Sequence, residues 1–144
     1  MIIQDFYIKD WNWSVRVYYY VDDYYMDMIA QDLGLCGCEE VDKTIDSLFE
    51  SIENSGLTYS NPDERCSIIV IGKTSCPEEF QSTFDHEKGH LAVHIALTDD
   101  ISWMSEEYQY LVGEIGKQMY PVAKMFLCEH CINDLHRFAG TFIG

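Results

Sequence analysis

The chain has 144 residues, 47% of them apolar and 14% aromatic, so it can bury a core, and the sequence predicts one domain over residues 1–144. Its formal net charge of −16 argues against direct binding of nucleic acid or of an anionic membrane surface, because both require cationic patches. No apolar run approaches the roughly 20 residues that span a bilayer, and the N-terminus lacks a signal-peptide pattern, so we expect a cytoplasmic protein.

The first part of the chain predicts a hairpin followed by two helices. Residues 2–8 and 13–21 are rich in β-branched and aromatic residues, which favours two antiparallel strands. Apolar residues at helical spacing predict amphipathic helices over 22–35 and 39–55. Residues 22–64 hold twelve acidic residues and one basic residue, and most such runs are solvated helix faces.

The second part predicts a third strand and two more helices. Residues 58–65 are expected to form a loop before an apolar strand over 66–72. A capping-box pattern of Ser75 and Glu78 predicts a helix that runs to about Leu97. A further helix is expected over 105–120. The expected fold is α+β, with a three-stranded, mostly antiparallel sheet packed on helices.

A zinc-binding motif lies inside the helix predicted after Ser75. His86, Glu87 and His90 form an HExxH sequence. Histidines four residues apart share one helix face and can both reach a Zn²⁺ ion, while the glutamate between them can act as a general base for a water molecule. His94 lies about 12 Å along the helix from His86, too far to share the ion, and is expected to line the site instead.

Catalytic zinc commonly takes three protein ligands, so a carboxylate is expected to complete the pair. Glu106 and Glu107 begin the next predicted helix, and an antiparallel return would bring one of them towards the histidines. Glu107 shares the apolar stripe of Leu111, so we favour Glu107 over Glu106 as the third ligand.

Two cysteine pairs allow a second zinc site. Cys36 and Cys38 are separated by one residue, and Cys128 and Cys131 by two. The first spacing is shorter than structural zinc sites use. We therefore favour reduced thiols without a metal, and a thiolate zinc site and a redox pair are the alternatives.

The strand, the HExxH helix and the following helix with its glutamates resemble the minimal core of gluzincin zinc metallopeptidases. The chain is also similar to a family of small HExxH proteins of phages and mobile elements of gut bacteria. The segments that carry this similarity are KDWNWSVRV (9–17), GLTYSN (56–61), SIIVIGKT (67–74), HEKGHL (86–91) and EEYQYLVGEI (106–115). The resemblance implies a zincin-like fold with a central HExxH helix and, if the protein is phage-encoded, location in the host cytoplasm.

These observations predict a small zinc-dependent hydrolase, most plausibly a peptidase acting on a peptide or protein substrate. Zn²⁺ would be held by His86, His90 and Glu107 or Glu106, with Glu87 as general base. His94 and Tyr110 are candidates for a neutral donor to the developing oxyanion. The alternatives are an acidic interaction protein that keeps the zincin scaffold without catalysis and a virion component that zinc stabilises. The oligomeric state stays open.

Overall fold

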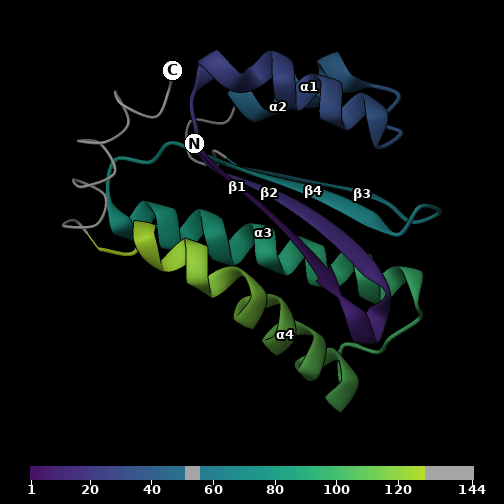
Figure 1. Ribbon diagram of the computed structural model, residues 1–144. Coiled ribbons are helices and arrows are strands. Elements are labelled where there is room, and N and C mark those ends of the chain that lie inside the picture. The colour runs from purple at the N-terminus through teal and green to yellow at the C-terminus, as the bar shows by residue number, and fades with distance from the viewer. Residues whose placement is uncertain (51–55, 129–144) are drawn as a thin grey trace.

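The computed structural model describes residues 1–50 and 56–128, and these form an α+β fold of three layers (Figure 1). A four-stranded sheet lies between two pairs of helices, with strand order β1-β2-β4-β3. The strands are β1 (Ile2–Ile8), β2 (Trp13–Val21), β3 (Gly56–Asn61) and β4 (Cys66–Gly72). β2 and β4 are parallel, and the β1–β2 and β3–β4 pairs are antiparallel.

Each face of the sheet is covered by two helices. On one face lie α1 (Met26–Leu35) and α2 (Val41–Glu50), and on the other lie α3 (Pro77–Thr98) and α4 (Glu106–Ala123) (Figure 1). α3 contacts β3 and β4, whereas α4 contacts β1. The long HExxH helix is therefore placed beside β3, at one edge of the sheet.

Alternation along the central strands builds two apolar cores. Val17 of β2 and Ile69 of β4 face α3 and α4, whereas Tyr18 and Ile68 belong to the core beneath α1. Successive strand residues point to opposite faces, and Ile68–Ile71 are all nearly or fully buried. A continuous apolar run is what a strand covered on both faces requires.

The hairpin and helices agree with the sequence, with small differences at the ends. The strands 2–8 and 13–21 have the predicted bounds. The second predicted helix, 39–55, begins two residues later than expected, since α2 is described over Val41–Glu50; residues 51–55 lie outside the described residues. α4 continues past Pro121 to Ala123. Within the described residues, no helix is both long and apolar enough to cross a membrane.

The sheet differs from the prediction in size and direction. The expected loop over 58–65 is wrong in its first part, because Gly56–Asn61 pairs with β4 along its whole length. The sequence of β3 is typical of a loop because the segment is short and partly polar and is followed by Pro62. Backbone pairing with the apolar strand β4 nevertheless stabilises it as an edge strand. The sheet is therefore mixed and four-stranded rather than three-stranded and mostly antiparallel.

Candidate functional site

α3 is the platform of the candidate site. Pro77 occupies its first turn, where a missing N–H costs no helical hydrogen bond. The Ser75 backbone N–H and hydroxyl both donate to Glu79 Oε2, at 3.0 and 2.8 Å. The N-cap of α3 is Cys76, which makes no side-chain capping hydrogen bond, so the predicted capping box of Ser75 and Glu78 is wrong.

The two motif histidines meet on the exposed side of α3. His86 and His90 are both exposed, and their Nε2 atoms lie 2.9 Å apart. In a tetrahedral zinc site with Zn–N bonds of 2.0–2.1 Å, two ring nitrogens lie about 3.3 Å apart. A separation larger by about 0.4 Å would give the two nitrogens the spacing of two zinc ligands.

Glu87 lies between the two histidines in sequence and points towards β3. Its side chain is buried, with 2% of its surface exposed. The Thr58 hydroxyl donates to Glu87, 3.0 Å from Oε1 and 3.2 Å from the carbonyl oxygen. Burial raises the pKa of Glu87, against the opposing effects of Thr58, His90 and His86. A carboxylate with a raised pKa is a stronger proton acceptor near neutral pH.

Gly56 provides the space that Glu87 occupies. A Cβ at position 56 would lie 2.5 Å from Glu87 Oε2 and 2.8 Å from its Cγ. Contacts that short would force the carboxylate or the start of β3 to move. The first residue of β3 therefore has to be glycine for Glu87 to keep this position.

A hydrogen-bonded chain connects His94 to the centre of the sheet. Trp13 Nε1 donates to Ser67 Oγ at 2.8 Å, Ser67 Oγ lies 2.7 Å from Ser60 Oγ, and Ser60 Oγ lies 2.6 Å from His94 Nδ1. An indole N–H can only donate, so Ser67 accepts from Trp13. One arrangement of the hydroxyl protons that satisfies the whole chain has Ser67 donate to Ser60 and Ser60 donate to His94.

This arrangement corresponds to one tautomer of His94. In it, Nδ1 accepts the hydrogen bond from Ser60, and the neutral ring carries its proton on Nε2. Burial, and then the charge of His90, lower the pKa of His94, which favours the neutral form. The His90 and His94 ring centroids are 6.1 Å apart. With this tautomer, His94 presents an N–H donor close to the histidine pair.

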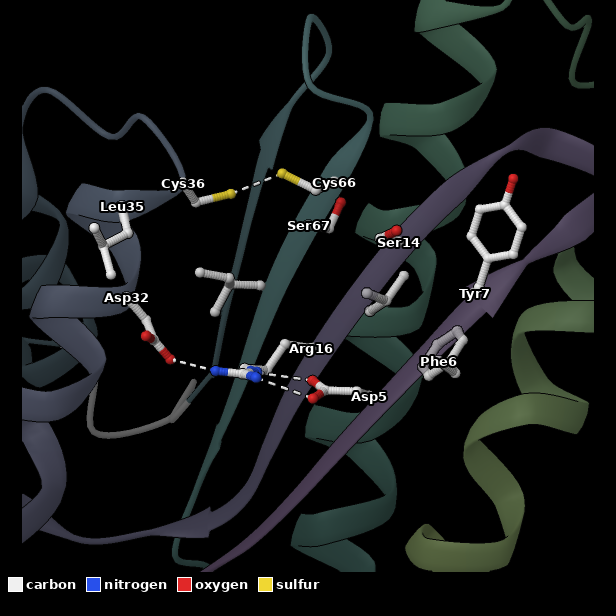
Figure 2. A pocket seen from close by; sticks show the side chains of 12 residues that line it. Asp5, Phe6, Tyr7, Ser14, Arg16, Asp32, Leu35, Cys36, Cys66 and Ser67 are labelled. Carbon is white, nitrogen blue, oxygen red and sulfur yellow. Dashed lines mark hydrogen bonds and ion pairs between the residues drawn. The ribbon is translucent and has the colours of Figure 1, made fainter.

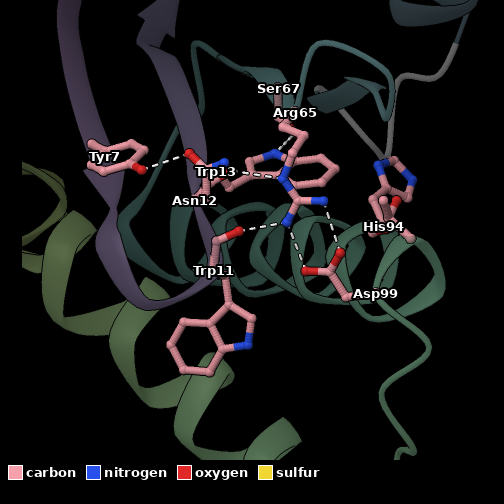
Figure 3. A network of polar contacts seen from close by, with 9 residues as sticks. Tyr7, Trp11, Asn12, Trp13, Arg65, Ser67, His94 and Asp99 are labelled. Carbon is pink, nitrogen blue, oxygen red and sulfur yellow. Dashed lines mark hydrogen bonds and ion pairs between the residues drawn. The ribbon is translucent and has the colours of Figure 1, made fainter.

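Arg65 contacts the Trp13 end of this hydrogen-bonded series. Arg65 donates to the carbonyl oxygens of Asn12 and Trp11 and pairs with Asp99 (Figure 3). The Arg65 guanidinium also lies 5.2 Å from the Trp13 ring centroid. Figure 3 shows that these groups join the β1–β2 turn to the end of α3, which holds the buried donor in place.

The structure does not bring the two candidate carboxylate ligands to the histidines. Glu106 and Glu107 are exposed on the first turn of α4. A Cβ added to Gly116 would lie 4.0 Å from Lys88 Nζ. The HExxH motif, which contains Lys88, is therefore beside the middle of α4. Glu107 is nine residues before Gly116, about 13 Å along the helix axis.

The packing of α4 explains this separation. α4 packs on the flank of α3 that carries Lys88 and Ala92. At about 100° per residue, His86 and His90 lie on another flank. Tyr110, the other candidate donor, is exposed on α4. Among residues 1–50 and 56–128, no group of three or more His, Cys, Asp or Glu side chains is arranged to hold a metal.

The described cysteines contact groups far from their neighbours in sequence. Cys36 Sγ lies 2.9 Å from Cys66 Sγ, and Cys38 Sγ lies 3.6 Å from the Thr44 hydroxyl. Cys128 is exposed, and Cys131 lies outside the described residues. Cys36 and Cys66 therefore form a thiol pair.

Sequence reasoning missed the part of the site that β3 contributes. Thr58 and Ser60 both point towards α3, and Gly56 precedes them on the same strand. Their alternation in the segment 56–61 is the available signal, because residues two apart share a strand face. Which helix they face depends on long-range packing that the segment does not encode.

Comparisons with protein-family models, curated proteins and solved structures found no match to this chain. The functional argument therefore rests on the geometry of α3 and β3.

Proposed function

We propose that this protein is a zinc-dependent hydrolase of peptide or amide bonds with a zincin-like arrangement of its HExxH helix beside a sheet edge. One observation carries the proposal. The Nε2 atoms of His86 and His90 converge to 2.9 Å, while the residue that follows His86 buries a carboxylate against β3. Two imidazoles and an adjacent general base are the groups that zinc-assisted hydrolysis uses.

His86 and His90 would hold the ion, which when bound acidifies a water molecule and polarises a carbonyl oxygen. Glu87 would take a proton from the attacking water and deliver it to the leaving amine. Thr58 and Gly56 position its carboxylate for this task. The proposal rests on the two histidines and does not depend on the third ligand predicted at Glu107 or Glu106. The binding experiment below tests both of these residues.

His94 would supply the neutral donor. Ser60 fixes the ring so that its Nε2–H remains available to an oxygen that gains negative charge. The substrate would lie along β3, because this strand is at the edge of the sheet and an edge can accept an extended segment by backbone hydrogen bonding. β4 is not available for this role, because it is paired on both sides.

The test of catalysis is Glu87→Gln. Purified protein loaded with Zn²⁺ is screened against a peptide library, and the variant is expected to lower turnover by about 10²- to 10⁴-fold at unchanged zinc content. Glu78→Gln is the matched control. Glu78 is exposed on the same helix and lies about two turns before His86. Equal cleavage by Glu87→Gln and wild type would contradict the proposal.

The test of metal binding is independent of substrate. His90→Ala is expected to abolish stoichiometric zinc binding, measured by calorimetry, and His94→Ala to preserve it. Glu107→Gln and Glu106→Gln are expected to leave the affinity within about threefold, because both residues lie far from the histidines. A large loss with Glu107→Gln would show that α4 adopts another position when zinc binds.

The alternative is an acidic interaction protein. Exposed acids on α2, including Asp42 and Asp46, lie in the helical layer on the opposite side of the sheet from the histidines. Zinc-independent binding to a basic partner that is lost in Asp42→Asn/Asp46→Asn, together with no zinc-dependent cleavage, would favour this alternative over the hydrolase.

A further inference from the structure

Two thiols from distant parts of the chain meet on the α1 side of the sheet. Cys36 caps the C-terminal end of α1, and Cys66 is the first residue of β4. Their sulfur atoms lie 2.9 Å apart, whereas a disulfide bond requires about 2.05 Å. A shift of less than about 1 Å would join them.

The position of Cys36 is fixed by the strand beside Cys66. Asn61 pairs with Cys66 in the β3–β4 register, and Asn61 Nδ2 donates to the Cys36 carbonyl oxygen at 2.8 Å. The next residue, Gly37, has a φ of +96°, and a Cβ there would lie 2.6 Å from Asn61 Nδ2. Glycine at 37 therefore permits the close approach that brings the thiols together.

The same end of α1 is held by an ion-pair bridge. Arg16 Nη1 lies 3.1 Å from Asp32 on α1, and Arg16 Nε lies 2.7 Å from Asp5 on β1. These groups and both thiols line a cavity of about 610 Å³ between α1 and the sheet (Figure 2). The thiols therefore face a space that a small molecule can enter.

We propose that Cys36 and Cys66 form a thiol–disulfide exchange site that small disulfides convert into an intramolecular disulfide. In the first step, the Cys66 sulfur attacks one sulfur of the small disulfide, loses its proton to solvent and releases one thiolate. In the second, Cys36 attacks Cys66 Sγ and releases the other half of the reagent. Overall, one small disulfide is reduced to two thiols as the two cysteines are oxidised.

The environment of Cys36 supports this order of attack. Burial, and then the adjacent Cys66 thiol, raise the pKa of Cys36 to about 12. The thiolate is the form that attacks disulfides, so Cys36 is the slower of the two to react with a disulfide from solution. In the second step the Cys66 sulfur is already beside it, and this proximity favours the attack. As Cys36 attacks, its proton passes to the thiolate that leaves, so the second half of the reagent departs as a thiol.

The resulting disulfide would also constrain the candidate hydrolase site. Cys36 and Cys66 are 30 positions apart, and the segment between them includes β3 with Thr58 and Ser60. Closing a loop of this size reduces the freedom of the unfolded chain, and the expected rise in Tm is on the order of 10 °C.

The experiment uses the reduced full-length chain and glutathione disulfide. After incubation, free thiols are alkylated, and peptide mapping by mass spectrometry identifies the linked cysteines. We expect a Cys36–Cys66 cross-link and a Tm increase that a reductant reverses. A cross-link between Cys36 and Cys38, or glutathione on Cys66 without any cross-link, would overturn the proposal.

Single variants test the order of the two steps. Cys36→Ser is expected to retain glutathione on Cys66 as a stable mixed disulfide, and Cys66→Ser to leave Cys36 unmodified. Cys76→Ser is the control, since Cys76 caps α3 on the other side of the sheet, and it is expected to form the same Cys36–Cys66 cross-link as wild type. Glutathione on Cys36 in Cys66→Ser, at the wild-type rate, would contradict the assigned order.

Discussion

Gly56 and Glu87 are packed so closely that a Cβ on Gly56 would lie 2.5 Å from Glu87 Oε2. The first residue of an edge strand thus determines where the buried carboxylate of the HExxH motif can lie. Because the neighbouring histidines are exposed whereas Glu87 is buried against β3, displacement of Glu87 need not disturb them. The metal ligands and the general base can therefore be separated by mutation.

Gly56→Ala is expected to reduce peptide cleavage by about 10²-fold through misplacement of the general base, and to lower the free energy of unfolding by about 1–3 kcal/mol through overpacking. Zinc stoichiometry is expected to stay unchanged. Activity assays, calorimetry and denaturant unfolding measure the three quantities.

Gly113→Ala is the matched control for this substitution. No atom lies within 4 Å of a Cβ at Gly113, which is on α4, so alanine is expected to stabilise the protein by about 0.5–1 kcal/mol. Wild-type activity in Gly56→Ala would show that Glu87 does not need this position.

Glu87→Gln is expected to stabilise the metal-free protein at neutral pH. Burial raises the pKa of Glu87 above its ordinary value of 4.5, so the native state binds this proton more tightly than the unfolded chain. The stabilisation is present below pH 4.5 and is lost as pH rises through the native pKa. Glutamine keeps the shape without the charge.

Thermal unfolding of both proteins from about pH 4 to pH 8 checks this sign. The Tm of Glu87→Gln is expected to exceed that of wild type at the upper end of the range, and the difference is expected to shrink towards acid. A difference that grows as pH falls would mean that the buried carboxylate is stabilised as the anion.

Ser60→Ala is expected to release the tautomer of His94. In wild type, the Ser60 hydroxyl lies 2.6 Å from His94 Nδ1, and we expect Ser60 to be the donor. Long-range ¹H–¹⁵N spectra are then expected to show the proton on Nε2 and protonation of the ring below its ordinary pKa of 6.5. Without the Ser60 donor, the neutral ring is favoured less and the pKa of His94 is expected to rise. Ser82→Ala, at an exposed position on α3, is expected to leave the spectrum unchanged, and a proton on Nδ1 in wild type would refute the chain of donors from Trp13.

Local pattern was enough for the elements that carry their own periodicity. The two aromatic segments define the β1–β2 hairpin with correct bounds, and the i,i+4 spacing places His86 and His90 on one face of α3 with their Nε2 atoms in contact. Strand alternation and helical spacing are properties of residues close together in sequence. They can therefore be recognised without knowing how the rest of the chain packs.

The tertiary structure decided which groups surround those histidines. Segment 56–61 becomes a strand because β4 pairs with it, and only that pairing brings Thr58 to Glu87 and Ser60 to His94. Helix packing likewise places Glu107 away from the motif, although the apolar stripe of α4 suggested the opposite. The contact of Cys36 with Cys66 also depends on a long-range hydrogen bond, from Asn61. These contacts join residues far apart in sequence, and their geometry follows from how helices and strands pack, which local sequence patterns do not contain.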